Sequence, residues 1–403
     1  MARKIINVAL NGVTGRMGYR QHLVRSLLAI REQGGIPLDV GPVSGGTVSG
    51  GTVSGDTAPE GTILYPEPIL VGRSEERLRA IAERHGLSRW TTSLDEVLGD
   101  PGVDVYFDTQ VTSARVGSLL RAIEAGKQVY TEKPVAESLS DALALAEAAR
   151  ARGITSGVVQ DKLFLPGMIK LRRLVREGFF GEVLSARLEF GYWVFEGDGA
   201  PAQRPSWNYR SEDGGGIVLD MFPHWQYLLE DLLGPVTALY ARHVTHVPQR
   251  WDESGRPYPV TADDAAYALL EFESGAIASV NSSWAVRVNR RELVELQVDG
   301  TSGSAVAGLR HCIVQPRACT PMPVWNPDLP DPIDYQAQWA EVPDHQVFDN
   351  GFKVQWELFL KAVAAGTPFP WDLAEGARGV QLARLALQSS AEGRRVDVPR
   401  LAG

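Results

Sequence analysis

The feature that most constrains the fold is a short apolar segment that runs into a glycine-rich turn near the start of the chain. Residues 5–10 are apolar and rich in β-branched side chains, and residues 11–18 read Asn-Gly-Val-Thr-Gly-Arg-Met-Gly. Apolar residues then recur at helical spacing over residues 19–33. A buried parallel strand, a tight turn and a helix are therefore predicted in this order, which is how an open α/β sheet begins.

Glycines at such a turn let the backbone approach a pyrophosphate, and the helix N-terminus that follows attracts anions. The spacing is Gly-x-x-Gly-x-x-Gly rather than the commoner Gly-x-Gly-x-x-Gly. We predict a dinucleotide cofactor site here; the alternative is a turn that only packs the strand against the helix. The predicted cofactor contacts in the turn are Gly12, Thr14, Gly15, Arg16, Met17 and Gly18.

A second predicted strand, residues 68–72, ends at Arg73 and Ser74. A domain that prefers NAD usually carries Asp or Glu at this strand end, where it binds the ribose 2′-hydroxyl. A guanidinium and a hydroxyl suit the 2′-phosphate of NADP better, so both residues are predicted cofactor contacts and NADP is favoured within NAD(P). The alternative is that Arg73 stacks on adenine, which works with either cofactor. Residues 43–55 repeat Val-Ser-Gly-Gly-Thr and are predicted to form a low-complexity surface insertion.

Strands and helices alternate up to about residue 155. Strands are predicted at residues 103–108, 128–131 and 155–160, and helices at 75–85, 113–125 and 140–152, the last capped by Ser138 or Ser140. This alternation is typical of a doubly wound parallel sheet. Residues 1–155 are therefore predicted to form a dinucleotide-binding domain of the Rossmann type.

The segment Tyr130-Thr131-Glu132-Lys133-Pro134 follows one of these strands. A lysine there lies at the carboxyl end of a strand, where an open α/β sheet binds its ligands. We predict that Lys133 contacts the reacting hydroxyl of a substrate; the alternative is a solvated loop lysine. Four residues that follow strands are predicted to contact the cofactor, namely Thr109, Gln110, Glu132 and Lys133.

The pattern changes after residue 155. A helix is predicted at residues 168–177, and strands at 183–192, 236–247, 265–272, 276–284 and 292–298. Consecutive strands without helices between them predict a large, mostly antiparallel sheet with one open face. An α+β domain is therefore predicted for residues 156–403, with helices at 352–364 and 373–391 and a proline-rich loop at 321–332.

Gly214-Gly215-Gly216 opens a predicted helix that ends at Gly234. Asp220 is predicted as its N-cap, and Asp220 and His224 are four residues apart, so they share one side of the helix start. A histidine is a natural proton acceptor, and a nearby carboxylate can bind a hydroxyl. The alternative is a core histidine. Four residues before the helix are predicted to line a sugar-sized pocket rather than only pack a loop, namely Trp207, Asn208, Tyr209 and Arg210.

The bulk composition excludes several classes of partner. A net charge of −9 and an isoelectric point of about 5.4 argue against nucleic acid or an anionic membrane as partner. No signal peptide is expected, because Met1-Ala2-Arg3-Lys4 leads into a short strand-like run rather than a long apolar segment. No membrane-spanning helix is expected, because no apolar stretch reaches about 18 residues. The two cysteines, Cys312 and Cys319, form neither a disulfide framework nor a metal pattern, which favours a reduced, cytoplasmic protein without a metal.

Taken together, these segments resemble the glucose–fructose oxidoreductase / inositol dehydrogenase / rhizopine catabolism (Gfo/Idh/MocA) family over nearly the whole length. The likeness includes the glycine turn, residues 125–134 with Glu132-Lys133-Pro134, residues 177–183, Gly214-Gly215-Gly216 with Asp220 and His224, and residues 300–303 and 390–393. The resemblance implies NAD(P)-dependent hydride transfer at a hydroxyl or keto group of a sugar or polyol. It also implies that the domain of residues 156–403 binds substrate and mediates oligomerisation, as a homodimer or homotetramer that forms through the C-terminal sheet.

The same resemblance implies roles for three catalytic residues. His224 takes the proton of the substrate hydroxyl, Lys133 stabilises the developing alkoxide, and Asp220 orients the sugar.

The sequence departs from the family pattern at three places. Residues 109–112 read Thr-Gln-Val-Thr where relatives have Pro-Asn and then His, and Tyr227 stands where Asp is common. Asp161-Lys162 stands where many relatives carry an aromatic or Asn-Arg pair, so we expect Lys162 to face the pocket and favour an anionic or richly hydroxylated substrate. The glycine turn is also similar to that of dihydrodipicolinate reductase, a shorter family without this Glu-Lys-Pro arrangement.

Three functions are therefore compared. The first is a sugar or polyol dehydrogenase that exchanges its cofactor. The second is a glycosidase that retains NAD(P) for transient oxidation and elimination. The third is a non-catalytic NADP-binding regulator, against which the presence of Lys133, Asp220 and His224 argues.

Overall fold

The computed structural model describes residues 2–38, 61–287, 292–322, 326, 328–330, 333, 334 and 336–401. The chain forms two compact units, one of residues 1–164 and 349–380, the other of residues 165–348 and 381–402. The first unit thus includes a C-terminal segment that the sequence-based division at residue 155 assigned to the second domain. The repeat at residues 43–55 and part of the loop at 321–332 lie outside the described residues.

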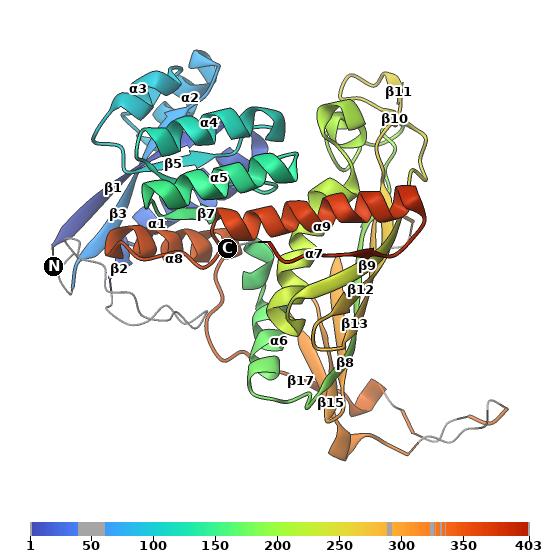
Figure 1. Cartoon of the computed structure of the whole chain (residues 1–403). Coiled ribbons are helices and arrows are strands. Elements are labelled where there is room, and N and C mark those ends of the chain that lie inside the picture. Colours follow the sequence, from blue (N-terminus) through green and yellow to red (C-terminus); the bar gives the residue numbers. More distant parts are fainter. Residues whose placement is uncertain are drawn as a thin grey trace. The chain divides into compact units, whose positions relative to one another are not determined.

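The first unit is built on a seven-stranded sheet, drawn mostly in blue and green in Figure 1. Its strand order is β2-β3-β1-β5-β6-β7, with β4 paired to β3, and every pairing except β2–β3 is parallel. This confirms the predicted doubly wound sheet. The bounds are β1 Arg3–Asn11, β2 Ile36–Pro37, β3 Ile63–Val71, β4 Trp90–Thr91, β5 Val105–Asp108, β6 Gln128–Thr131 and β7 Ser156–Val158.

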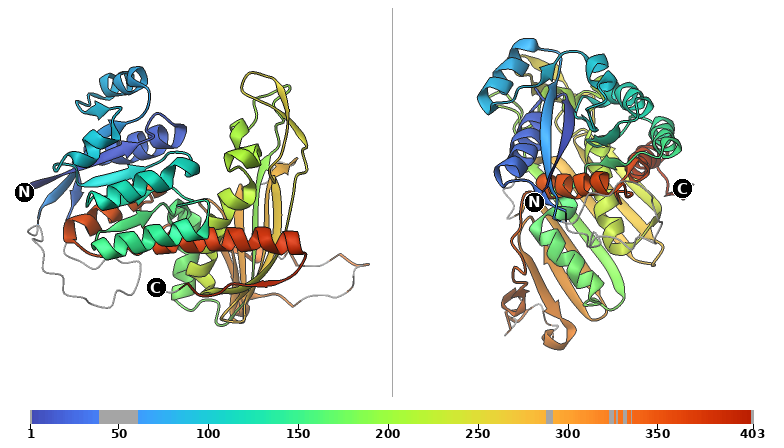
Figure 2. Two further views of the ribbon diagram at one scale, coloured as in Figure 1. Left: turned by 45° about the horizontal axis from the view of Figure 1, so that its top comes forward. Right: turned by 90° about the vertical axis from the view of Figure 1, so that its left-hand side faces the viewer.

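The helices of this unit cover the sheet on both faces. α4 and α5 pack together, and η1, α1 and α8 pack together, as the two clusters in Figure 2 show. Right-handed crossovers in opposite directions from β1 and β5 require this arrangement. The bounds are η1 Gly18–Leu28, α1 Ala29–Glu32, α2 Glu75–His85, α3 Leu94–Gly99, α4 Thr112–Glu124, α5 Leu139–Arg152, η2 Asp161–Phe164 and α8 Gly351–Ala365.

The helix after the glycine turn is a π-helix, which the sequence pattern did not indicate. The Ser26 hydroxyl donates to the Gln21 carbonyl oxygen, five residues earlier, at 2.7 Å. π-Helical turns are rare and often occur at functional sites. The predicted helix is therefore confirmed, while its hydrogen-bond pattern is a finding of the structure.

Strand order reverses direction between β1 and β5. The chain passes from β1 outward to β3, then returns across β1 to β5 and continues to β6 and β7. The loops after β1 and β5 therefore flank the topological switch point, where sheets of this kind bind their ligands.

The second unit contains a nine-stranded sheet of order β17-β16-β15-β14-β8-β13-β12-β9-β18. Most neighbours are antiparallel, as predicted, but β8 runs parallel to β13 and antiparallel to β14. The sequence pattern did not indicate this parallel pairing, because a long connection between β8 and β13 allows either direction. The bounds are β8 Val183–Trp193, β9 Val236–Val244, β12 Ala265–Phe272, β13 Ile277–Val286, β14 Val294–Gly300, β15 Gly303–Ala307, β16 Cys312–Pro316, β17 Ala340–Glu341 and β18 Val396–Asp397.

Helices α6 (Pro166–Arg176) and α7 (Ile217–Leu233) pack on one face of this sheet, as Figure 1 shows. The opposite face exposes apolar side chains at Tyr240, Tyr267, Leu269 and Ile277. The remaining elements are α9 Leu373–Glu392, a hairpin of β10 Gln249–Trp251 with β11 Pro257–Pro259, and the 3₁₀ turns η3 Ser206–Tyr209, η4 Ser211–Asp213, η5 Arg317–Cys319 and η6 Gln336–Gln338. Within the described ranges, no helix is both long and apolar enough to span a bilayer.

Candidate functional site

The glycine turn brings two loops into contact at the switch point. Gly12 has φ +85°, and a Cβ there would lie 3.0 Å from the carbonyl carbon and oxygen of Thr109. A Cβ on Gly18 would lie 2.8 Å from the Gly12 carbonyl oxygen. No side chain caps the start of η1, and the Tyr19 backbone N–H bonds to the Gly15 carbonyl oxygen at 2.9 Å. A close backbone approach beside an uncapped helix start fits the pyrophosphate of a dinucleotide.

The predicted ribose-side residues follow β3. Arg73 is exposed, and so is Arg16 in the glycine turn. The Ser74 oxygen accepts the Arg77 backbone N–H at 3.4 Å and caps α2. Ser74 thus stabilises the start of α2, whereas the guanidinium groups of Arg73 and Arg16 are exposed at the surface.

Beneath the β5 loop lies a buried polar cluster that the sequence reasoning missed. Asp108 accepts hydrogen bonds from the Tyr106 hydroxyl at 2.8 Å and the Gln110 backbone N–H at 3.0 Å. Arg115 Nε lies 3.3 Å from Asp108 Oδ1, and its other nitrogens donate to the carbonyl oxygens of Gln110 and Pro134. Burial raises the pKa of Asp108, and the Arg115 charge opposes that rise. Arg115 thereby ties the Gln110 loop to the Glu132–Pro134 segment.

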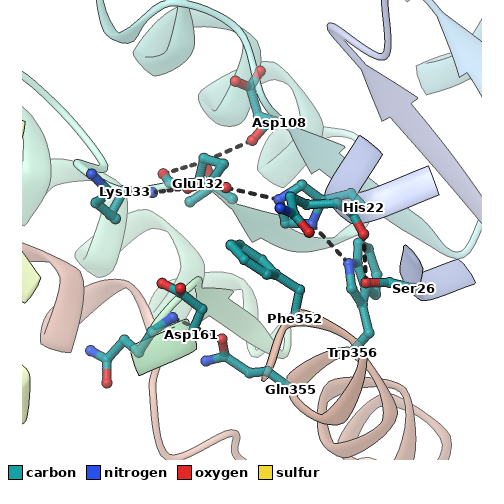
Figure 3. A network of polar contacts seen from close by, with 12 residues as sticks. His22, Ser26, Asp108, Glu132, Lys133, Asp161, Phe352, Gln355 and Trp356 are labelled. Atoms are coloured by element: carbon teal, nitrogen blue, oxygen red, sulfur yellow. Dashed lines mark hydrogen bonds and ion pairs between the residues drawn. The ribbon is translucent and has the colours of Figure 1, made fainter. Parts of the chain in front are cut away.

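The Glu132–Lys133 segment is held from its other side by His22 (Figure 3). Glu132 is buried, with Oε1 2.8 Å from His22 Nε2 and Oε2 accepting the Lys133 backbone N–H at 3.2 Å. Burial opposes ionisation, but the His22 hydrogen bond and the nearby positive charges hold the pKa of Glu132 below its ordinary value. Lys133 is half-buried at the end of β6, and its peptide bond to Pro134 is cis.

Lys162 lies on η2 in the same unit. Its ammonium is 3.5 Å from Asp161 Oδ2, and both residues are half-buried. Helix α8 fixes the preceding segment, because Gln355 accepts from the Gln160 backbone N–H at 2.7 Å and donates to the Val158 carbonyl at 3.1 Å. The Lys162 charge is thus already partly balanced by a neighbouring carboxylate.

In the second unit, the predicted N-cap of α7 is wrong. Gly216 is the N-cap, with φ +120°, and Asp263 accepts the Val218 backbone N–H at 2.8 Å. Asp220 is the fourth residue of the helix and pairs with Arg204 Nη2 at 2.6 Å. A side chain from another segment caps α7, so the Asp220 carboxylate is left to interact with a guanidinium instead.

His224 is buried one turn after Asp220. Its Nδ1 lies 2.7 Å from the Tyr227 hydroxyl oxygen. Tyr227, which stands where family members often have Asp, therefore supplies the partner that orients the imidazole. The predicted pair lies on one helix, and the sequence had named both His224 and the departure at Tyr227.

The four residues predicted to line a pocket face different surroundings. Trp207 is exposed at 42%, whereas Asn208 is buried and donates to the Pro205 carbonyl at 3.1 Å. Tyr209 is wholly buried, with Arg250 over its ring at 4.0 Å, and burial raises its pKa. Arg210 lies over the Tyr258 ring at 4.5 Å. Asn208 and Tyr209 therefore pack the loop, which agrees with the alternative interpretation for these two residues.

The predicted residues thus gather in two groups, each within its own unit. The glycine turn, Thr109, Gln110, Glu132 and Lys133 lie at the carboxyl ends of β1, β5 and β6. Asp220 and His224 lie on α7. In the described part of the chain, no cluster of three or more His, Cys, Asp or Glu side chains is arranged to hold a metal ion.

Two family models match the chain. Residues 69–159 match the "Oxidoreductase family, NAD-binding Rossmann fold" and residues 168–306 match the "GFO/IDH/MocA C-terminal domain". A curated D-xylose dehydrogenase of Paenarthrobacter nicotinovorans is 54% identical over 401 residues, which is 98% of each chain. The chain belongs to the Gfo/Idh/MocA family.

More distant similarities agree with this assignment. A 1,5-anhydro-D-fructose reductase of Ensifer adhaerens is 28% identical over 240 residues, or 59% of this chain and 66% of that protein. The solved structure of a levoglucosan dehydrogenase in complex with NADH and L-sorbose matches the fold with a TM-score of 0.76 at 21% identity and covers all of both chains. The chain is an NAD(P)-dependent oxidoreductase of the sugar dehydrogenase type.

Proposed function

We propose that this Gfo/Idh/MocA protein oxidises D-xylose, or an aldose of closely similar shape, with NAD(P)+ as hydride acceptor. The observation that carries this proposal is the 54% identity to a D-xylose dehydrogenase over 98% of both chains. When bound, the cofactor supplies the redox chemistry, and the protein supplies position and charge.

Lys133 is proposed to hydrogen-bond the reacting oxygen and to stabilise negative charge as its proton leaves. Its support is its place at the end of β6, with Glu132 accepting its backbone N–H at 3.2 Å. The Arg115 contact with the Pro134 carbonyl fixes the residue that follows Lys133.

His224 is proposed as the general base. For Nε2 to accept the hydroxyl proton, Nδ1 must carry the other hydrogen, and the Tyr227 hydroxyl oxygen 2.7 Å away can accept it. Asp220 is proposed to orient the sugar through a second hydroxyl, with its carboxylate held by the pairing with Arg204.

Within NAD(P), we propose a preference for NADP. The exposed guanidinium groups of Arg73 and Arg16 suit a 2′-phosphate, and residues 72–74 carry no carboxylate for a ribose diol. The oligomer is proposed to be a homodimer or homotetramer through the open face of the nine-stranded sheet. There Tyr240 pairs with Leu269 across β9 and β12, and the two are 38% and 51% exposed.

The test is a steady-state assay of reduced cofactor with D-xylose, other aldopentoses, D-glucose and myo-inositol, each with NAD+ and NADP+. D-Xylose should give the highest kcat/KM, and K133M and H224A should lower kcat at least about 100-fold. A protein that releases no reduced cofactor with any sugar, but purifies with bound cofactor and consumes a glycoside, would refute the dehydrogenase and indicate the redox glycosidase. Undiminished activity in both variants would refute the assigned roles.

A further inference from the structure

A continuous chain of buried hydrogen bonds reaches the Glu132–Lys133 segment from helix α8 (Figure 3). Trp356 Nε1 lies 3.0 Å from His22 Nδ1, and His22 Nε2 lies 2.8 Å from Glu132 Oε1. The other Glu132 oxygen accepts the Lys133 backbone N–H. Three elements distant in sequence therefore meet within the first unit at the end of β6.

The chemistry of the three groups fixes the direction of each hydrogen bond. An indole N–H can only donate, so Nδ1 of His22 must be the acceptor and carries no hydrogen. Nε2 then carries the ring proton and donates it to Glu132. The neutral tautomer with its hydrogen on Nε2 satisfies both contacts. The protonated imidazolium does not, because its Nδ1–H would point at the indole N–H of Trp356.

Among the described residues, aromatic side chains pack against His22. The ring is 0% exposed and lies between Phe107, with ring centroids 4.3 Å apart, and Phe352, edge-on at 5.2 Å. The π-helix carries His22, and its Ser26 hydroxyl is bonded to the Gln21 carbonyl. Aromatic rings surround the buried imidazole, so both hydrogen bonds form in a low-dielectric environment, where they are electrostatically stronger than in water.

We propose that His22 is a positioning residue for the reaction, and that Trp356 acts through it. The His22 tautomer, fixed by the indole N–H, holds the Glu132 carboxylate in the orientation that also accepts the Lys133 backbone N–H. Glu132 thereby sets where the Lys133 side chain leaves the end of β6. This inference rests on the proposed role of Lys133 at the reacting oxygen.

A packing role and a positioning role predict opposite results for two substitutions. Leucine fills much of the imidazole volume but supplies no donor to Glu132, which would leave a buried carboxylate oxygen without its partner. Glutamine carries an amide that can accept from Trp356 and donate to Glu132 at the same time. A packing role favours H22L over H22Q, and a positioning role favours H22Q over H22L.

The experiment measures kcat and the KM for D-xylose, together with the cofactor Kd by direct titration, in H22Q, H22L and W356F. H22L should lose about 10- to 100-fold in kcat, the effect of one hydrogen bond to a charged group, with KM and Kd within about threefold of wild type. H22Q should stay within about threefold of the wild-type kcat. W356F should fall between them, because it frees Nδ1 without removing the donor to Glu132. The matched control is W371F, another buried tryptophan of the same unit that lies outside this chain of contacts.

Wild-type kcat in H22L, or an H22Q enzyme no faster than H22L, would overturn the proposal. If H22L does not fold, W356F and the ring nitrogen signals of labelled histidine decide it: His22 should show a protonated Nε2 and an unprotonated Nδ1, and the reverse assignment refutes the argument. K133M in the same series distinguishes failure of the role proposed for Lys133 from failure of the role proposed for His22. A fully active K133M refutes the proposed role of Lys133, whereas an inactive K133M beside a fully active H22L refutes only the role of His22.

Discussion

Replacement of Arg115 by methionine tests the buried cluster beneath the β5 loop. Arg115 is 3% exposed and provides the one cationic group within hydrogen-bond reach of Asp108 among the described contacts, at 3.3 Å. Removing one member of a buried ion pair leaves the other charge uncompensated, which costs about 3–5 kcal/mol. For a unit of this size, that corresponds to a fall in Tm of roughly 6–20 °C.

The loss of stability should depend on pH. Burial already raises the pKa of Asp108 in the folded protein above its ordinary value, and removing Arg115 raises it further. A carboxyl group whose folded pKa is raised stabilises the fold while it is protonated, at low pH, and this contribution is lost as pH rises through the folded pKa. R115M should therefore lie closer to wild type at pH 5 than at pH 8.

Differential scanning calorimetry at both pH values measures this effect. R121M is the matched control, because Arg121 lies on the same helix and pairs with the exposed Asp95, a contact expected to contribute less than about 1 kcal/mol. D108N combined with R115M should recover part of the loss, since it removes the unpaired charge. A Tm within about 2 °C of wild type at pH 8, or a larger loss at pH 5, would refute the reasoning.

Three further predictions concern the cofactor turn, a helix cap and the base. G12A should weaken cofactor binding at least about 10-fold in a fluorescence titration, because Gly12 has φ +85° and its new Cβ would lie 3.0 Å from Thr109 backbone atoms; unchanged binding would contradict the pyrophosphate assignment. S138A should lower the free energy of unfolding by about 1 kcal/mol in urea, because Ser138 caps α5 by accepting the Asp141 N–H, and a change below a few tenths would argue against that cap. Y227F should lower kcat by about 10- to 100-fold, because it removes the acceptor for His224 Nδ1, and equal kcat values would show that Tyr227 does not set the tautomer.

The parts of the fold that depend on local pattern were predictable. β6 and β12 begin and end at the expected residues, and α2 runs over Glu75–His85 as predicted, because the patterns that indicate strands and helices involve neighbouring residues. The direction of β8 against β13 was not predictable, since that pairing joins segments about 90 residues apart. The π-helix was also missed, because its spacing resembles that of an ordinary helix over one or two turns.

In the candidate site too, features carried by neighbouring residues were predictable and contacts between distant segments were not. The glycine turn, Lys133 and His224 could be proposed from the sequence because each lies in a short signature that carries its chemistry. Trp356 could not be found as the partner of His22, because 334 residues separate them and a tryptophan in a helical pattern indicates only core packing. Asp220 was misassigned as an N-cap because the N-cap is Gly216, and the carboxylate that accepts the Val218 N–H at the helix start, Asp263, comes from another segment.

The division of the first unit into residues 1–164 and 349–380 bears on how the protein is made. When residue 164 leaves the ribosome, the imidazole of His22 and the backbone N–H of Gln160 still lack Trp356 and Gln355, the partners that α8 later brings. At about 5–20 residues per second, the 192 residues from 164 to 356 take roughly 10–40 s to synthesise. During that interval the nascent N-terminal segment has an incomplete core. The second unit begins later in the chain, yet it is translated almost completely before the first unit can complete its core. A chain released before α8 is translated would therefore be a substrate for chaperones and proteases rather than a shortened enzyme.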